Sequence, residues 1–133
     1  MDISKEKKVR DVMTRGVITV SHDTPMNEIV KILVGKDISG IVVTAPDNEA
    51  LGVISEIDII KVMDKDWSSL TAEDIMSQFV RAIDPETTLM KAADTVRELN
   101  IHRLLILHRA PGRSYGVPVG VLSASDILRA IVT

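Results

Sequence analysis

The chain has 133 residues, of which 45% are hydrophobic, and its formal net charge is -3 at pH 7. This length and apolar content suffice for one compact core, whereas the negative charge and the presence of only one Trp, one Tyr and one Phe disfavour nucleic-acid binding. The absence of cysteine excludes disulfides and thiolate metal sites, and the polar N-terminus lacks a signal core, so we predict a cytoplasmic protein. No apolar run approaches the ~20 residues that span a bilayer, so we expect no direct membrane link.

Each half of the chain begins with the same two short elements. A helix with a polar start is predicted at Val9–Met13 and again at Ala72–Met76. A short extended segment follows at 17–20 and at 80–83. The elements of the first half therefore recur in the second, in the same order.

The main helix of each half comes next. In the first half Thr24 is the expected N-cap, and Pro25 suits the first helical turn. Apolar residues then recur at i, i+3, i+4 and i+7, which predicts a helix with one face turned inward. These residues are Met26, Ile29, Val30 and Leu33 in the first half, and Leu89, Ala92, Ala93 and Val96 in the second.

A hairpin of two strands follows the main helix. Residues 40–44 and 103–107 are short, continuous apolar runs, typical of strands that are covered on both faces. The segment Ala45–Asn48 is a strong turn signal. It leads to a second strand at 51–54, which recurs at 119–122.

A closing helix is predicted at Ile57–Met63 and again at Ile127–Val132. Both helices carry apolar residues around more than half of their circumference, a pattern typical of helices that are buried on two sides. One side can pack on the sheet of its own half. We expect either the other half or a second copy of the chain, in a homodimer, to cover the other side.

The two halves are a tandem repeat. The offset between equivalent residues is 63 from Asp11 and Asp74 onward and rises to 68 by the last strand, and the extra five residues fall in the Pro- and Gly-containing loop 110–118. Repeats this short must pack together to bury their apolar faces. We therefore predict a mixed α+β fold of two pseudo-symmetric units, residues 1–66 and 67–133, which together form one module.

The pattern Gly-x-x-Ser-x-x-Asp, at Gly52–Asp58 and Gly120–Asp126, connects the last strand of each repeat to its closing helix. Its Ser and Asp fit a capping box, in which they satisfy free amides of the first helical turn. The same groups suit a nucleoside phosphate, because the carboxylate accepts hydrogen bonds from two vicinal ribose hydroxyls. The glycine allows a ligand or the other repeat to approach the strand closely. The spacing alone leaves the capping and ligand interpretations open.

This ordered set resembles the CBS domain, named after cystathionine beta-synthase, and nearly the whole chain resembles a stand-alone tandem CBS pair. The resemblance rests on Asp11–Thr14 and Asp74–Ser77, on Ile101–Leu105, and on both Gly-x-x-Ser-x-x-Asp segments. It implies two units packed sheet to sheet, with clefts between the repeats that bind adenosine-containing ligands such as AMP, ADP, ATP or S-adenosylmethionine. It also implies further association into dimers.

Functional residues of the family transfer to matching positions of this chain. The resemblance assigns ribose binding to the carboxylates of Asp58 and Asp126, and it places the hydroxyls of Ser55 and Ser123 beside them in the ligand site. It assigns base-facing positions to Thr19, Val20, Ile38, Ala82, Ile83 and Ile101, and a basic pair that reaches phosphates to His102 and Arg103.

The two repeats differ at the basic pair. The residues aligned with His102 and Arg103 are Ser39 and Gly40, so the two clefts are not equivalent. The cleft with Arg103 should prefer a phosphorylated ligand, since a guanidinium holds phosphate bidentately, whereas the uncharged cleft should tolerate a nucleoside or a sulfonium. A surface arginine at a strand start is an equal alternative for Arg103, and a partly exposed structural imidazole is the favoured interpretation of His102.

The leading functional hypothesis is a regulatory module for energy sensing, which binds an adenosyl ligand without a required cofactor and transmits the change to an unknown effector protein. A ligand-free dimeric scaffold, in which both Ser–Asp pairs serve only as caps, is the alternative. A nucleotide-processing enzyme has little support, because no nucleophile has a positioned base. The histidines are too far apart for a metal site, so we predict neither catalytic residues nor metal ligands.

Overall fold

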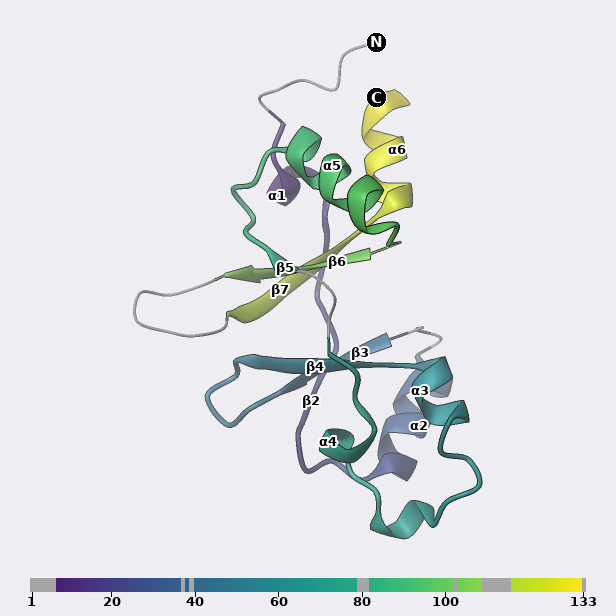
Figure 1. Ribbon diagram of the computed structural model, residues 1–133. Coiled ribbons are helices and arrows are strands. Elements are labelled where there is room, and N and C mark those ends of the chain that lie inside the picture. The colour runs from purple at the N-terminus through teal and green to yellow at the C-terminus, as the bar shows by residue number, and fades with distance from the viewer. Residues whose placement is uncertain are drawn as a thin grey trace. The chain divides into compact units, whose positions relative to one another are not determined.

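The computed structural model describes residues 7–36, 38, 40–78, 82–101, 103–108 and 116–132 (Figure 1). The chain divides into two compact units, each with its own sheet and helices. We call Ile18–Phe79 the continuous unit, and Met1–Val17 together with Val80–Thr133 the split unit. The architecture confirms the predicted mixed α+β class.

The continuous unit has a three-stranded sheet of order β2-β3-β4, in which β2 runs parallel to β3 and β3 antiparallel to β4. Its helices pack on one face of the sheet (Figure 1). The chain adds one more pairing at the free edge of β4, where Val53 and Ser77 exchange two backbone hydrogen bonds of 2.8 Å. The elements are β2 (Thr19–Ser21), α2 (Met26–Gly35), β3 (Gly40–Thr44), β4 (Ala50–Ser55), α3 (Glu56–Ile60), the 3-10 turn η1 (Trp67–Ser69) and α4 (Ala72–Ile75).

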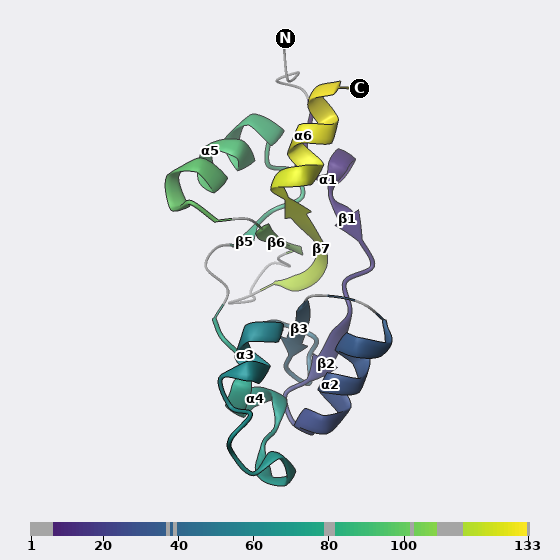
Figure 2. The same ribbon diagram turned by 90° about the vertical axis from the view of Figure 1, so that its right-hand side faces the viewer.

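The split unit has the same plan with one strand more. Its sheet has the order β1-β7-β6-β5, and Figure 2 shows β1 alongside β7. The pair Thr14 and Val121 in that ladder corresponds to Ser77 and Val53 in the continuous unit. The elements are α1 (Val9–Val12), β1 (Thr14–Arg15), β5 (Ala82–Ile83), α5 (Leu89–Leu99), β6 (Arg103–His108), β7 (Val117–Ser123) and α6 (Ala124–Val132).

Each unit has its own hydrophobic core, and the two cores use equivalent positions. Alternate residues of the central strand point toward the helices, since successive side chains of a strand face opposite sides. The predicted apolar stripes of the main helices supply the other side of each core. Equivalent core pairs include Met26 and Leu89, Ile41 and Leu104, Val43 and Ile106, Ile54 and Leu122, and Ile59 and Ile127.

The opening helices are exchanged between the repeats. Helix α1 begins the first repeat but packs in the split unit, where the amide of Val9 donates to the carbonyl of Thr87 at 2.9 Å. Helix α4 begins the second repeat but packs in the continuous unit, where the amide of Ala72 donates to the carbonyl of Thr24 at 2.8 Å. These two bonds occupy equivalent positions. The compact units therefore group the elements differently from two consecutive halves of the chain.

Two local expectations were wrong. Thr24 does not cap α2, whose N-cap residue is Pro25, and the first helical residue is Met26. The closing helix of the first repeat ends at Ile60, and turns follow it as far as Asp64. The carbonyl of Thr24 instead accepts a hydrogen bond from the first residue of α4, so Thr24 helps to hold this helix in the continuous unit.

Both closing helices leave apolar side chains in solvent. Ile60 is 58% exposed and its counterpart Leu128 is 63% exposed. In the part of the chain that the structure describes, no helix is long and apolar enough to cross a membrane.

Candidate functional site

The first Ser–Asp pair lies where β4 ends and α3 begins. Ser55 precedes the helix, and its amide and its hydroxyl donate to Asp58 Oδ2 at 2.8 and 3.1 Å. The other carboxylate oxygen, Oδ1, accepts a 2.5 Å hydrogen bond from the hydroxyl of Ser77. Asp58 is only 6% exposed, so its carboxylate is buried and held by three donors of the continuous unit.

The second Ser–Asp pair has the same place in the split unit, between β7 and α6. The Ser123 amide donates to Asp126 Oδ2 at 2.9 Å, and the Asp126 amide donates to the Ser123 hydroxyl oxygen at 3.1 Å. Oδ1 of Asp126 accepts from the guanidinium of Arg129, one turn further along α6. Asp126 is also 6% exposed, but its second oxygen is held by a cation instead of a hydroxyl.

Both pairs therefore make the bonds expected of helix caps. Asp–amide bonds of this kind satisfy a donor that the first helical turn leaves without an intrahelical partner. The same arrangement gathers a buried carboxylate and a hydroxyl at one end of each sheet. The capping and ligand interpretations are thus compatible in geometry, and they differ in which hydrogen-bonding positions are still open.

Arg103 lies beside the second pair. It is the first residue of β6 and stands opposite Ser123 in the antiparallel ladder, with its side chain exposed. In the continuous unit Gly40 stands opposite Ser55 at the equivalent position. The predicted alignment of Arg103 with Gly40 is thus confirmed by the strand register. The charged residue shares a unit with Asp126, and His102 lies outside the described residues.

The repeated glycines are explained by close backbone approach. A Cβ on Gly52 would lie 2.7 Å from the carbonyl oxygen of Ser77 and 2.9 Å from the sulfur of Met76. A Cβ on Gly120 would lie 2.7 Å from the carbonyl oxygen of Thr14 and 2.9 Å from the sulfur of Met13. The exchanged Met-Ser and Met-Thr segments therefore run across the last strands, where a side chain has no room.

The predicted base-facing residues lie in several different places. Thr19 is exposed on β2, whereas the side chain of Val20 is part of the core of the continuous unit. Ile101 is partly buried against the core of the split unit. Ile38 lines a groove of about 380 Å³ between α2 and α3, and Glu56 at the start of α3 lines the same groove. Ile38 is thus close to the helix start that carries the first Ser–Asp pair.

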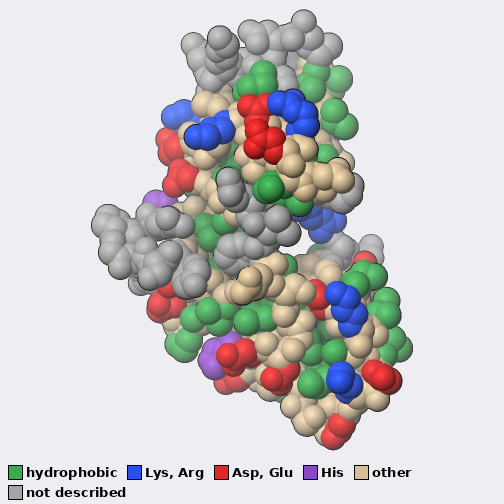
Figure 3. Space-filling model, in the orientation of Figure 1, with side chains coloured by type: hydrophobic (Ala, Val, Ile, Leu, Met, Phe, Trp, Pro, Cys, Tyr) green, Lys and Arg blue, Asp and Glu red, His purple; other side chains and the backbone are tan. Residues whose placement is uncertain are grey.

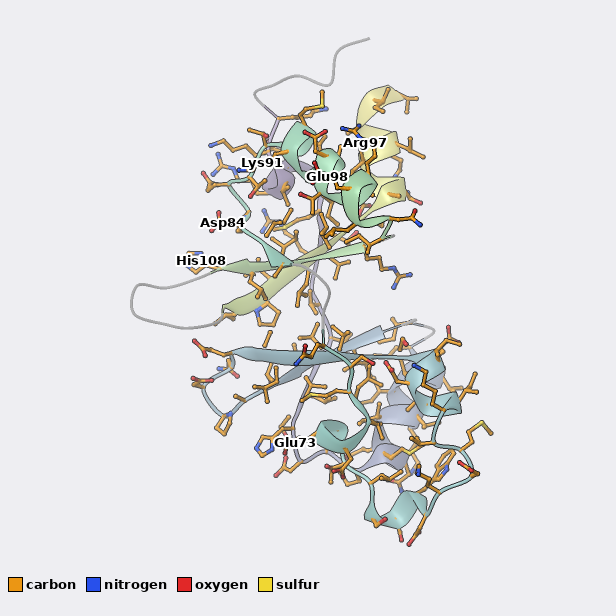
Figure 4. The ribbon with its side chains drawn as sticks, viewed as in Figure 1. Glu73, Asp84, Lys91, Arg97, Glu98 and His108 are labelled. Carbon is orange, nitrogen blue, oxygen red and sulfur yellow. The ribbon has the colours of Figure 1, made fainter. Side chains whose placement is uncertain are left out.

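Ala82 and Ile83 line a smaller hollow of about 220 Å³, together with Asp84 and Leu107. Figure 4 labels Asp84, which directly follows β5, and His108, the last residue of β6. Leu107 is four residues from Arg103 along β6, a separation of about 13 Å at roughly 3.3 Å per residue. The hollow therefore lies toward the other end of the sheet from Arg103 and Ser123.

The sequence predictions missed Ser77 and Arg129, which both contact a site carboxylate. Arg129 follows Asp126 by three residues on one helix, a spacing at which opposite charges pair. The sequence alone could therefore have predicted this contact. Ser77 belongs to the repeated opening motif but lies 19 residues from Asp58. Only the exchange of opening segments brings its hydroxyl to the carboxylate.

The CBS domain model matches residues 9–65 and 72–133. The chain belongs to the CBS domain family. The two matches confirm the tandem pair that the repeated motifs predicted. Within the described residues, no group of three or more His, Asp or Glu side chains is placed to hold a metal ion.

Curated relatives are distant, and most are longer than this chain. The uncharacterized protein MJ1225 of Methanocaldococcus jannaschii is 23% identical over 124 residues, which are 92% of this chain and 42% of that protein. The inosine-5'-monophosphate dehydrogenase of Nitrosopumilus maritimus is 24% identical over 126 residues, which are 95% of this chain and 25% of that enzyme. The chain thus spans less than half of either relative.

Solved structures share the fold over almost the full length. The CBS domain of a CBS domain-containing membrane protein from Sphaerobacter thermophilus has a TM-score of 0.78 and 24% identity, covering 95% of this chain and 88% of that one. CBSX2 in complex with AMP has a TM-score of 0.76 and 21% identity, with coverages of 95% and 96%. The CBS pair of protein MJ0100, in complex with 5'-methylthioadenosine and S-adenosyl-L-methionine, has a TM-score of 0.72 and 23% identity, also with coverages of 95% and 96%.

Proposed function

We propose that this CBS pair is a regulatory module that binds an adenosine-containing small molecule through Ser55 and Asp58, through Ser123 and Asp126, or through both pairs. The observation that carries the proposal is the duplicated pair itself, a buried carboxylate and a serine at the same strand–helix junction of each unit. A carboxylate in this setting accepts bonds from the vicinal hydroxyls of a ribose. The AMP, 5'-methylthioadenosine and S-adenosylmethionine complexes of two similar folds support the choice of ligand class.

The charges near the two pairs support different ligands. Arg103 and Arg129 both belong to the unit that contains Asp126, and a guanidinium binds phosphate through two parallel hydrogen bonds. We therefore assign AMP, ADP or ATP to the Ser123–Asp126 pair. The Ser55–Asp58 pair has Gly40 in the place of Arg103, so we assign to it an uncharged nucleoside or the sulfonium of S-adenosylmethionine.

A ligand-free scaffold is the second candidate, and one observation favours it. Both Ser–Asp pairs make capping hydrogen bonds within their own units, and Asp58 also accepts from Ser77. Every helix start needs such bonds, whereas few helix starts bind ligands. In this case the pairs would stabilise the fold and have no part in recognition.

Transmission to a partner is the second part of the proposal. The exposed apolar side chains of α3 and α6 are suited to a contact with a second copy of the chain. Figure 3 shows hydrophobic side chains on the surface of the continuous unit, whose exposed members on α3 are Ile57 and Ile60. We propose a homodimer through these helices, in which ligand binding alters the contact with an effector protein. A cytoplasmic location stays a prediction from the cysteine-free composition.

A thermal-unfolding panel tests ligand binding. The purified protein is heated with AMP, ADP, ATP, S-adenosylmethionine, NAD or cyclic di-AMP, each at saturating concentration. A ligand of the native state at 100 times its dissociation constant stabilises by about 2.7 kcal/mol, which raises the melting temperature by several degrees. We expect at least one adenosyl ligand to do so, whereas a flat panel would favour the scaffold.

The double variant Asp58→Asn with Asp126→Asn tests the assigned residues. It keeps the shape of each side chain but removes the charge, and we expect the ligand-induced shift to disappear. Asp66→Asn is the matched control, because Asp66 also accepts from the amide and hydroxyl of a serine, Ser68, and belongs to neither Ser–Asp pair. A ligand shift that survives the double variant would refute the site assignment.

A further inference from the structure

The two Ser–Asp pairs differ in how many hydrogen-bonding positions they leave open. An ionised carboxylate has about four acceptor positions, two on each oxygen. Asp58 uses three of them, for the Ser55 amide, the Ser55 hydroxyl and the Ser77 hydroxyl. Within the described part of the chain Asp126 uses two, for the Ser123 amide and for Arg129. A ribose diol needs two positions, so Asp126 can accept both hydroxyls and Asp58 cannot.

The serine hydroxyls differ in the same direction. The Ser55 hydroxyl donates its hydrogen to Asp58 at 3.1 Å, so it has no second hydrogen for a ligand. The Ser123 hydroxyl accepts from the Asp126 amide, also at 3.1 Å, so its hydrogen is available for another acceptor. The second pair therefore offers both a donor and two acceptor positions, with Arg103 opposite Ser123.

The hydrogen bond that blocks Oδ1 of Asp58 is donated by Ser77, which follows the exchanged opening helix α4. Ser77 is tied to β4 by its two backbone bonds with Val53, and this places its hydroxyl 2.5 Å from Asp58 Oδ1. The counterpart in the split unit is Thr14, which pairs with Val121 in the same way. Among the described residues Thr14 makes no hydrogen bond to Asp126, whose Oδ1 is bonded to Arg129. A hydrogen bond from the opening segment to the Asp carboxylate is therefore made only in the continuous unit, among the described residues.

We propose that the hydroxyl of Ser77 competes with ligand for Oδ1 of Asp58. The Ser123–Asp126 pair is then the high-affinity site, and the Ser55–Asp58 pair is latched, that is, blocked by Ser77 until this hydrogen bond breaks. This inference rests on the proposed adenosyl-binding function and specifies how that function is divided between the repeats. A ligand reaches Asp58 only when Ser77 releases Oδ1. Removing the hydroxyl of Ser77 opens the latched site.

The test is a binding isotherm with AMP and with adenosine for the full chain, measured by calorimetry and expressed per chain. For the wild type we expect one tight class of AMP sites and a second, weaker class. A hydrogen bond to a charged group contributes about 1.5–3 kcal/mol, so Ser77→Ala should tighten the weaker class about tenfold to a hundredfold. Ser77 is exposed, and its bonds to Val53 are made by the backbone, so the variant should keep its fold.

Three further variants identify the classes. Thr14→Ala removes the counterpart hydroxyl, and we expect the wild-type isotherm. Ser77→Thr restores a hydroxyl, and we expect it to return the weaker class to its wild-type affinity. Asp126→Asn should remove the tight class, both alone and combined with Ser77→Ala, and in the combined variant the tightened class should remain.

The outcomes separate this inference from the function on which it rests. No binding of AMP or adenosine to the wild type or to Ser77→Ala overturns both. Binding that Asp126→Asn leaves tight, or a weaker class that Ser77→Ala leaves unchanged, overturns the latch and keeps the adenosyl-binding function. Equal tightening by Thr14→Ala and Ser77→Ala also overturns it, because the effect would then not depend on the bond to Asp58.

Discussion

The continuous unit and the split unit have one backbone plan and two kinds of polar chemistry. In each unit an exchanged opening helix bonds to the start of the main helix, and a Met-Ser or Met-Thr segment crosses the glycine of the last strand. At the adjacent Ser–Asp pair the units diverge, since Asp58 is held by the hydroxyl of Ser77 and Asp126 by the guanidinium of Arg129. A duplicated framework thus keeps its packing while the hydrogen-bond donors around its two carboxylates differ.

The packing that the units share should give the strongest response to mutation. Gly52→Ala and Gly120→Ala each place a Cβ 2.7 Å from a backbone carbonyl oxygen, which cannot move without breaking strand pairing. We expect each substitution to lower the free energy of unfolding by about 1–3 kcal/mol, as overpacking of a core does. Urea unfolding monitored by circular dichroism measures the change.

Gly35→Ala is the control for this pair. Gly35 is the last residue of α2 and has no positive φ, and a Cβ added to it would meet no atom within 4 Å, so alanine should be neutral or stabilise the helix by at most about 0.5–1 kcal/mol. Similar losses for Gly52→Ala and Gly120→Ala would support equivalent packing in the two units. A loss confined to one of them would show that the units are packed differently.

The starts of the two main helices should differ by a smaller amount. Thr88 caps α5, and its hydroxyl oxygen accepts from the Lys91 amide at 3.2 Å, whereas Pro25 at the equivalent place makes no such bond. Thr88→Ala should therefore cost about 1 kcal/mol in thermal or urea unfolding. Thr95→Ala, in the middle of α5, is the control and should be neutral or slightly stabilising. Equal losses for both would argue against a capping role.

The ion pairs at the opening helices should matter less. Glu86 pairs with Lys8 at 3.3 Å and Arg10 at 2.7 Å in the split unit. Glu73 on α4, labelled in Figure 4, lies 3.6 Å from Nδ1 of His22, a contact that is an ion pair only when the imidazole is protonated. All are partly exposed, so Glu86→Gln should cost at most about 1 kcal/mol at low salt and Glu73→Gln a few tenths. Repeating the unfolding in about 0.5 M salt, where screening removes such effects, should bring both variants close to the wild type. A loss that is insensitive to salt would point to packing instead.

Two exposed carboxylates of the continuous unit should respond least. Hydrogen bonds from Ser21 and Ser68 lower the pKa of Asp23 and of Asp66 below the ordinary value of 3.8. A depressed pKa contributes stability above the unfolded-state value, and this is lost as the pH falls through the lower folded-state value. Ser21→Ala should move the pKa of Asp23 upward, and Ser68→Ala that of Asp66, in an NMR titration. If the carboxyl titrates in the variant as in the wild type, the hydrogen bond from the serine is not the cause of the lowered pKa.

Much of the fold follows from local patterns. The stripe from Met26 to Leu33 and its repeat are core residues because helical periodicity alone turns them to one side. The runs in β3 and β6 are buried because a continuous apolar strand has no face suited to water. The offset between repeats aligned Arg103 with Gly40, and the strand register agrees, since Arg103 stands opposite Ser123 and Gly40 opposite Ser55.

The errors arose at the ends of helices. Thr24 is of a residue type favoured at N-caps, but the helix begins after Pro25. The carbonyl of Thr24 instead accepts from the amide of Ala72, 48 positions away along the chain. The closing helix was expected to reach Met63, because apolar residues continue past Ile60. Apolar composition does not fix where a helix ends.

Periodicity and spacing were enough to predict the tandem repeat, the core positions and the two Ser–Asp pairs, because these signals act within a few residues. The family came from the resemblance of the repeated motifs and from the match of the family model. Only the tertiary structure shows with which repeat each opening helix packs, because the caps and apolar residues of that helix are compatible with either repeat. That exchange brings Ser77 to Asp58, whereas Asp126 is bonded to Arg129 of its own helix. The number of open positions on a carboxylate depends on every donor within reach, and donors that are distant in the sequence become neighbours only when the chain folds.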